Sequence, residues 1–101
     1  MIQRTFRRRR LHQPPSSLLN LGCGQHRHPG WTNVDLVPAG GDVICCDLRQ
    51  PLPFAAGSFT AAYAAHVVEH LAPVEARRLV AEMRRVLQPG GIVRIVVPDL
   101  E

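Results

Sequence analysis

A short apolar segment that ends in a glycine turn constrains this chain more than any other feature. Residues 18–21 read Leu-Leu-Asn-Leu, and Gly22-Cys23-Gly24 follows at once. An apolar run of this length bounded by glycine is typical of a buried strand in a parallel sheet. Gly22 and Gly24 allow a sharp turn and let a ligand approach main-chain N–H groups. Ligands of open α/β sheets bind beyond the carboxyl ends of the strands, so this turn marks a candidate pocket.

Five segments in all have the character of strands. They contain apolar and β-branched residues and are bounded by glycine, proline or acidic residues. The expected strands are 17–21, 32–36, 42–47, 59–65 and 92–97. The alanines of 59–65 would suit a helix by propensity alone, so that strand is predicted from its context.

Residues 73–87 carry the clearest helical pattern, because apolar side chains recur at helical spacing and charged residues fill the opposite face. Pro73 suits the first helical position, and Pro89-Gly90-Gly91 is predicted to stop the helix. The expected apolar stripe is Leu79, Val80, Met83, Val86 and Leu87.

The order of these elements predicts an α/β domain with an open, mostly parallel sheet. The links between the first three strands are short for a parallel sheet. A parallel crossover needs about a dozen residues, and these links are shorter. We therefore expect the first two crossovers to be turns rather than helices.

The net positive charge of the chain comes from its first ten residues. The formal net charge is +4, yet five of the twelve arginines lie within residues 1–10, leaving seven arginines against eight acids in the remainder. Residues 1–15 are expected to form a flexible basic arm, and residues 16–101 the domain. A nucleic-acid contact through the arm is an alternative role. Nucleic acid is not expected as the main partner.

The cysteines and the hydropathy indicate a cytoplasmic protein. Three cysteines, Cys23, Cys45 and Cys46, form no C-x-x-C pair, which disfavours a disulfide framework or a zinc site. Cys45 and Cys46 lie in an apolar run, where free cysteine usually acts as a small buried hydrophobe. No apolar run approaches the roughly 20 residues of a transmembrane helix, so no membrane span is expected.

Six short motifs then follow one another in a recognisable order. They are L-N-L-G-C-G at 19–24, G-W-T-N-V-D-L at 30–36, D-L at 47–48, P-L-P-F with S-F at 51–54 and 58–59, H-V-V-E-H-L at 66–71, and R-V-L-Q-P-G-G at 85–91. Together they resemble the class I S-adenosylmethionine-dependent methyltransferases. The resemblance implies a Rossmann-like open sheet of about five strands, incomplete relative to the seven-stranded fold of that family. It also implies S-adenosyl-L-methionine as the cofactor.

The resemblance implies a site as well. The backbone of 22–24 would pass the methionine part of the cofactor, and Asp35 would accept hydrogen bonds from the ribose. Asp47 would accept from the adenine amino group, and His66 would stand near the sulfonium as the candidate catalytic residue. No metal is expected. The full implied set for the cofactor is Asn20, Gly22, Cys23, Gly24, Asp35, Leu36, Asp47, Leu48 and His66.

The chain departs from the family pattern at three points. Asn20 replaces the usual acid, His26 stands where a third glycine is common, and the sequence ends before two further strands. We therefore expect a fragment that carries mainly the cofactor-binding half, with a small-molecule methyl acceptor. The alternative is a non-catalytic fragment that at most binds the cofactor. An uncovered strand edge also predicts self-association.

Two other motifs compete with this interpretation. His66-Val67-Val68-Glu69-His70 matches H-x-x-E-H, a zinc-peptidase signature that requires both histidines on one helix face. Gly22-x-Gly24 begins a dinucleotide fingerprint but lacks its third glycine. We favour a strand-to-loop junction for the first motif and the methyltransferase turn for the second. Trp31 is expected to pack on the sheet.

Overall fold

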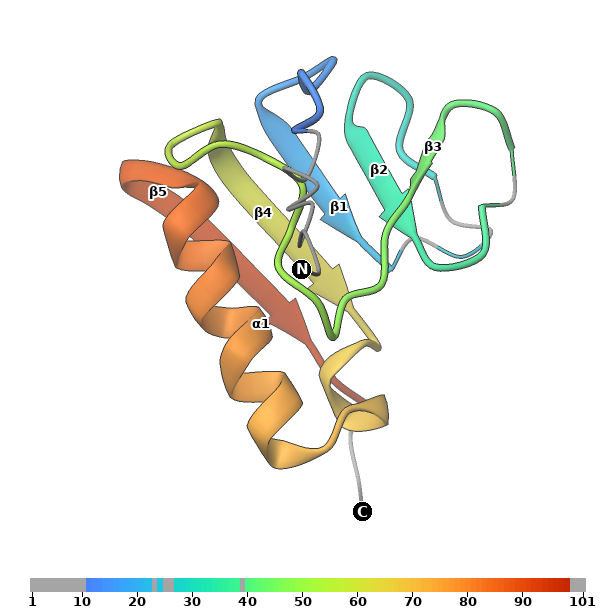
Figure 1. Cartoon of the computed structure of the whole chain (residues 1–101), viewed down its shortest axis with the longest axis vertical. Coiled ribbons are helices and arrows are strands. Elements are labelled where there is room, and N and C mark those ends of the chain that lie inside the picture. Colours follow the sequence, from blue (N-terminus) through green and yellow to red (C-terminus); the bar gives the residue numbers. More distant parts are fainter. Residues whose placement is uncertain (1–10, 23, 25–26, 39, 99–101) are drawn as a thin grey trace, which may run out of the picture.

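A computed structural model of the chain describes residues 11–22, 24, 27–38 and 40–98. The described part contains five strands, one α-helix and one short 3-10 helix (Figure 1). In chain order these are β1 (Leu18–Leu21), β2 (Thr32–Asp35), β3 (Val43–Cys45), β4 (Phe59–Ala65), η1 (Val68–His70), α1 (Pro73–Val86) and β5 (Leu87–Val96). The basic residues 1–10 lie outside the described residues, so the predicted arm stays a prediction.

The five strands form one parallel sheet in the order β3-β2-β1-β4-β5. The predicted α/β, Rossmann-like open sheet is therefore confirmed. β1 occupies the centre, because it pairs with β2 on one side and with β4 on the other. The chain moves outward from β1 to β3 and then returns to β1's other side. This reversal is the point at which open sheets of this type bind ligands.

The first two crossovers carry no helix among the described residues, as their lengths predicted. β4 and β5 are instead joined by η1 and α1, and Figure 1 shows α1 lying along β5 on one face of the sheet. That face is consequently the better covered of the two.

The element bounds differ from prediction mainly at β5. The helix ends at Val86, one residue early, and the strand begins at Leu87 rather than at 92. The Pro89-Gly90-Gly91 segment thus belongs to the strand, with an irregular register where Phe59 pairs with Leu87 and Ala61 with Ile92. Proline and glycine fit here because β5 is an edge strand with a bulge. β1 and β2 are each one residue shorter than expected and β3 is three residues shorter, whereas β4 has the predicted bounds.

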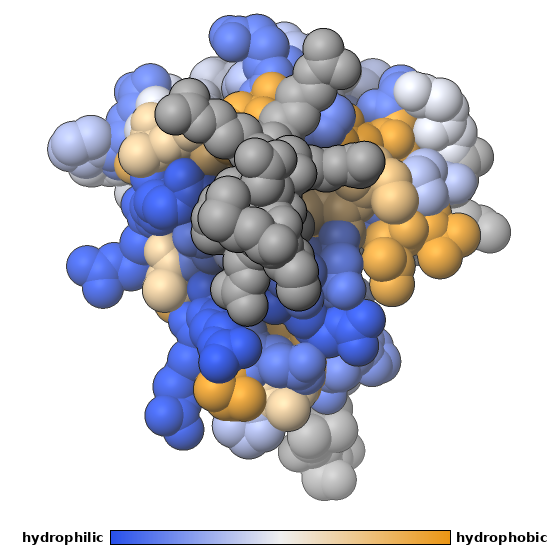
Figure 2. Space-filling model, in the orientation of Figure 1, coloured by the Kyte–Doolittle hydropathy of each residue, from blue (hydrophilic) through white to orange (hydrophobic). Residues whose placement is uncertain are grey.

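The hydrophobic core lies between α1 and the sheet. Helix residues Leu79, Met83 and Val86 are buried there, as the stripe predicted. The stripe was wrong about Val80, which is 37% exposed. Val80 lies beside Ile95 of the edge strand, where no further described element covers it. The outer surface of α1 is mainly hydrophilic, as Figure 2 shows.

The two adjacent cysteines separate in the structure. Cys46 is buried in the core, and Cys45 is exposed. The prediction that both are buried was therefore wrong for Cys45. Ile44 and Cys46 both pack with the core, and Cys45 between them is directed to the other side because side chains alternate along an extended chain.

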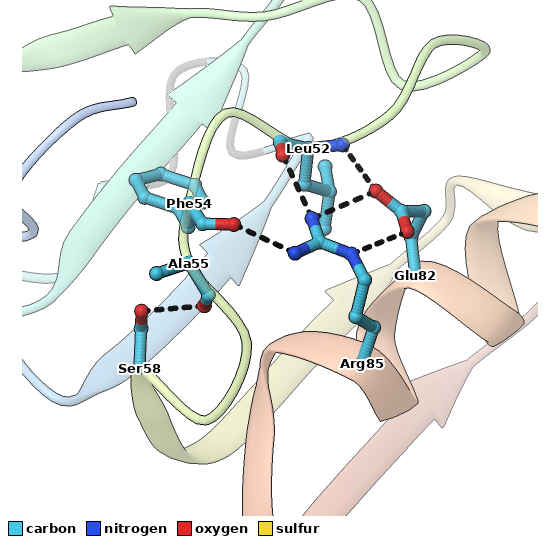
Figure 3. A network of polar contacts seen from close by, with 6 residues as sticks. All are labelled: Leu52, Phe54, Ala55, Ser58, Glu82 and Arg85. Carbon is cyan, nitrogen blue, oxygen red and sulfur yellow. Dashed lines mark hydrogen bonds and ion pairs between the residues drawn. The ribbon is translucent and has the colours of Figure 1, made fainter. Parts of the chain in front are cut away.

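The connection between β3 and β4 closes the core beside α1. Leu52 and Phe54 of this connection are fully buried, and the Phe54 ring meets Phe59 edge to face at a centroid distance of 5.0 Å. Arg85 of α1 fastens the connection, because its guanidinium donates to the carbonyl oxygens of Leu52 (2.9 Å) and Phe54 (2.8 Å). Figure 3 shows this side chain reaching from the helix into the loop.

Glu82 completes this network one turn earlier on the helix. Its carboxylate accepts from Arg85 Nε at 2.7 Å and from the Leu52 N–H at 2.6 Å. The pair raises the pKa of the Arg85 guanidinium through its hydrogen bond to the carboxylate. Glu82 and Arg85 belong to the charged residues of the predicted helix, and together they satisfy both the N–H and the carbonyl oxygen of Leu52 (Figure 3).

We predict that Arg85→Gln destabilises the fold by about 1–2 kcal/mol, because two loop carbonyls and a carboxylate lose a charged donor at a partly exposed site. Arg84→Gln is the matched control, since Arg84 is exposed on the same helical turn. It should change the free energy of unfolding by less than about 0.5 kcal/mol. Urea unfolding followed by circular dichroism measures both. Equal unfolding midpoints for the two variants would contradict the role given to Arg85.

Candidate functional site

The carboxyl ends of four strands converge on one hollow. Gly22 follows β1, Asp35 ends β2, Asp47 lies two residues beyond β3, and His66 follows β4. All four line a single hollow of about 380 Å³. The hollow also includes the predicted Leu36 and Leu48, and its remaining lining is Arg49, Val67, His70 and Leu71. Its size is within the range of small-molecule sites.

Gly22 makes the turn at the centre of this edge. Its φ of +63° favours glycine, and its N–H donates to the Val34 carbonyl at 2.9 Å. A Cβ on this residue would come within 2.5 Å of Val67 Cγ2. The position therefore requires glycine for two independent reasons, backbone conformation and lack of space.

Asp35 is tied to the glycine turn by a main-chain contact. The Gly24 N–H donates to Asp35 Oδ2 at 2.6 Å. A carboxylate can accept about four hydrogen bonds, so this contact leaves capacity for a ligand. The bond also orients the side chain at the mouth of the hollow.

Asp47 has an arginine partner. Arg49 donates to both Asp47 oxygens, from Nε and from Nη2, at 3.0 Å each, and its backbone N–H also reaches Oδ1 at 3.0 Å. These hydrogen bonds hold the pKa of the Asp47 carboxyl below its ordinary range. A ligand that binds Asp47 must share this carboxylate with Arg49 or displace it.

His66 is held in an unusual backbone conformation. Its φ is +56°, the one positive value among the described residues other than glycine. Its N–H donates to the Val96 carbonyl at 2.8 Å, which fixes the residue between β4 and β5. The side chain is 60% exposed, and its Nδ1 lies 3.9 Å from Glu69 Oε1. Left-handed backbone in a residue with a side chain is costly and clusters at functional sites.

A second hollow of about 400 Å³ adjoins the first. It is lined by Asn20, Leu21, Gly22, Gly24, His28, Tyr63, Ala65 and His66. Gly22 and His66 line both hollows, so the glycine turn and the histidine stand at their junction.

Asn20 has a structural contact that its motif position did not suggest. It is 3% exposed, and its Nδ2 donates to Asn33 Oδ1 at 2.9 Å. Asn33 in turn accepts from the His28 N–H at 3.0 Å and donates to the carbonyls of His28 and Trp31, both at 3.1 Å. Asn33 is not among the residues predicted for the site. A polar residue in the middle of a predicted buried strand was the available signal.

The comparisons with known proteins bear on this edge of the sheet. A family model described as a methyltransferase domain matches residues 31–95. The chain belongs to this methyltransferase family. No curated protein and no solved structure gives a significant match. The match to the methyltransferase model covers Asp35, Asp47 and His66 but begins after Gly22, so the glycine turn is placed beside them by the fold alone.

The competing interpretations gain no support from the geometry. His66 directly follows β4 and His70 is the last residue of η1, so the two histidines do not share a helix face. Among the described residues no three histidines, cysteines or acids gather in a metal-binding group. Within the same residues, no helix is long and apolar enough to cross a membrane. Cys23 and His26 lie outside the described residues, and the cofactor contact predicted for Cys23 stays a prediction.

We predict that Gly22→Ala destabilises the protein more than Gly57→Ala. Gly57 has a similar φ of +71°, but a Cβ there would meet no atom within 4 Å. Gly57→Ala should therefore cost about 1 kcal/mol for the backbone alone, and Gly22→Ala a further ~1–3 kcal/mol for the clash with Val67. Urea unfolding measures the difference. Equal losses would mean that Val67 moves aside freely.

We also predict that Arg49→Gln raises the pKa of Asp47 toward its ordinary range, because two charged hydrogen bonds are lost. The midpoint is measured from the carboxyl ¹³C shift during a pH titration. Arg84→Gln is the control, since Arg84 is exposed on α1 and does not line the hollow, and it should leave the Asp47 midpoint unchanged. An unchanged Asp47 midpoint would rule out Arg49 as the cause of the lowered pKa.

Proposed function

We propose that this chain binds S-adenosyl-L-methionine at the first hollow and serves methyl transfer to a small-molecule acceptor. The observation that carries the proposal is that Asp35 and Asp47 line one hollow with Gly22 and His66. A methyltransferase family match over most of the same residues supports it.

The residues of the hollow suit an adenosyl ligand by their chemistry. A ribose diol and an adenine amino group are hydrogen-bond donors, and Asp35 and Asp47 are acceptors on neighbouring strands. Leu36 and Leu48 line the same hollow and offer apolar surface to the ring. Gly22 carries no side chain that would obstruct the entrance from the second hollow.

His66 is the proposed catalytic residue. When bound, the cofactor supplies an electrophilic methyl group, and a large part of the protein's task is to orient the acceptor. His66 lines both hollows, so its imidazole is placed to accept a proton from an acceptor in the second one. The nearby Glu69 carboxylate would stabilise the resulting imidazolium. We also propose a cytoplasmic location, because three cysteines without a C-x-x-C pair disfavour a disulfide framework and suit a reducing compartment.

We predict that S-adenosylhomocysteine binds this chain and that Asp35→Asn weakens binding about tenfold, because a charged acceptor of the ribose is lost. Asp42→Asn is the matched control, since Asp42 lies outside both hollows and its side chain is 63% exposed. Isothermal titration calorimetry measures both affinities. Equal affinities for the two variants, or no binding by the parent chain, would refute the proposed site.

A turnover assay distinguishes an active enzyme from a fragment that only binds the cofactor. Transfer of a labelled methyl group to any member of an acceptor panel, lost in His66→Ala at cofactor concentrations that saturate that variant, would support catalysis by this chain. Binding without transfer across the panel would favour the alternative, a fragment that binds the cofactor only.

A further inference from the structure

A third hollow lies on the sheet face opposite α1. It measures about 390 Å³, and its lining includes His28, Trp31, Ala61, Tyr63, Ile92 and Arg94. Ile95 instead contacts the side of α1, so the alternation along β5 directs Ile92 and Arg94 to the other face. None of the residues predicted to bind the cofactor lines this hollow.

One wall of the third hollow is aromatic and fixed in place. The His28 ring lies 5.4 Å from the Trp31 ring and 5.9 Å from the Tyr63 ring, centroid to centroid. Asn33 holds the backbone of both His28 and Trp31 through three hydrogen bonds. The His28 ring is inclined by 46° to Trp31 and by 71° to Tyr63, so a planar group can stack on one ring and meet another at its edge.

Arg94 supplies the charge of this hollow. It is the register partner of Tyr63, so it lies beside the aromatic wall. Arg27 and Arg49 each pair with an aspartate, whereas Arg94 has no carboxylate partner among the described residues. The hollow's lining contains no acid. An unpaired guanidinium beside aromatic rings is suited to a planar ligand that carries a carboxylate.

The third hollow continues into the site. His28 and Tyr63 line both the second and third hollows, and Gly22 and His66 line both the first and second. Tyr63 lies in β4 and His66 follows that strand three residues further along the chain, a separation of at most about 10 Å. A one-ring compound with a short acidic side chain has about this span.

We propose that the second and third hollows together bind the methyl acceptor, and that the acceptor is an aromatic carboxylate. This inference rests on the proposed function. The carboxylate pairs with Arg94, the ring stacks on His28, and the nucleophilic atom at the other end reaches His66. There the lone pair of that atom forms a bond to the methyl carbon, the carbon–sulfur electron pair returns to sulfur, and the displaced proton passes to His66.

Trp31 makes this inference directly measurable, because it is the only tryptophan in the chain. The probe is 3-phenylpropanoate, which does not absorb where tryptophan is selectively excited, and its neutral counterpart is 3-phenylpropanamide. We expect millimolar 3-phenylpropanoate to change Trp31 fluorescence saturably and to bind at least about fivefold more tightly than the amide.

Two arginine variants test the assignment of the charge. Arg94→Gln should weaken 3-phenylpropanoate binding about fivefold and leave the amide unchanged. Arg84→Gln removes the same charge from the outer surface of α1 and should change neither affinity. Equal binding of acid and amide would overturn the proposal. So would an Arg94→Gln variant that binds the acid as the parent does, or a Trp31 signal that does not respond.

Calorimetry with S-adenosylhomocysteine distinguishes this inference from the function on which it rests. Arg94→Gln should retain that affinity, since Arg94 does not line the first hollow. S-adenosylhomocysteine binding without any 3-phenylpropanoate binding would overturn the acceptor assignment alone. Carboxylate binding that depends on Arg94 without S-adenosylhomocysteine binding would refute the methyl-transfer role and with it the acceptor proposal.

Discussion

The double pairing of β1 is the constraint on which the rest of the structure depends. Because β1 lies between β2 and β4 and all three are parallel, their carboxyl ends open on one edge of the sheet. The chain leaves β1 toward β2 and leaves β4 toward η1, so the two departing segments diverge. Gly22 and His66 stand on either side of that divergence and border both hollows. The site is thus a consequence of topology before any side chain is considered.

The two faces of the sheet are closed by different physical means. On one face α1 and the connection between β3 and β4 bury an apolar core, and Arg85 with Glu82 satisfies the main chain that this burial leaves without water. On the other face the connection from β1 to β2 is too short for a helix and is held instead by the buried amide of Asn33. A short connection held by hydrogen bonds covers less of the sheet than a packed helix does. This difference explains why the aromatic hollow with Arg94 lies on the second face.

The two carboxylates of the site are held by different partners. A main-chain N–H orients Asp35, whereas the guanidinium of the exposed Arg49 side chain covers Asp47. A ligand can add to the first carboxylate without removing its partner, but it competes with Arg49 at the second. An aspartate therefore stands at two neighbouring strand ends, but Asp35 is more available to a ligand than Asp47. Only the contacts made in the folded chain distinguish them.

The sequence by itself determined the elements and their order. Short apolar and β-branched runs predicted the five strands, and a helical pattern predicted α1. Acids at successive strand ends predicted that Asp35 and Asp47 would meet at one edge, because parallel strands share that edge. Tertiary structure decided what local patterns do not encode. The edge position of β5 allowed Pro89-Gly90-Gly91 into a strand and left Val80 exposed. Partners for Asn33 come from residues up to 13 positions away, so only the folded chain brings them together.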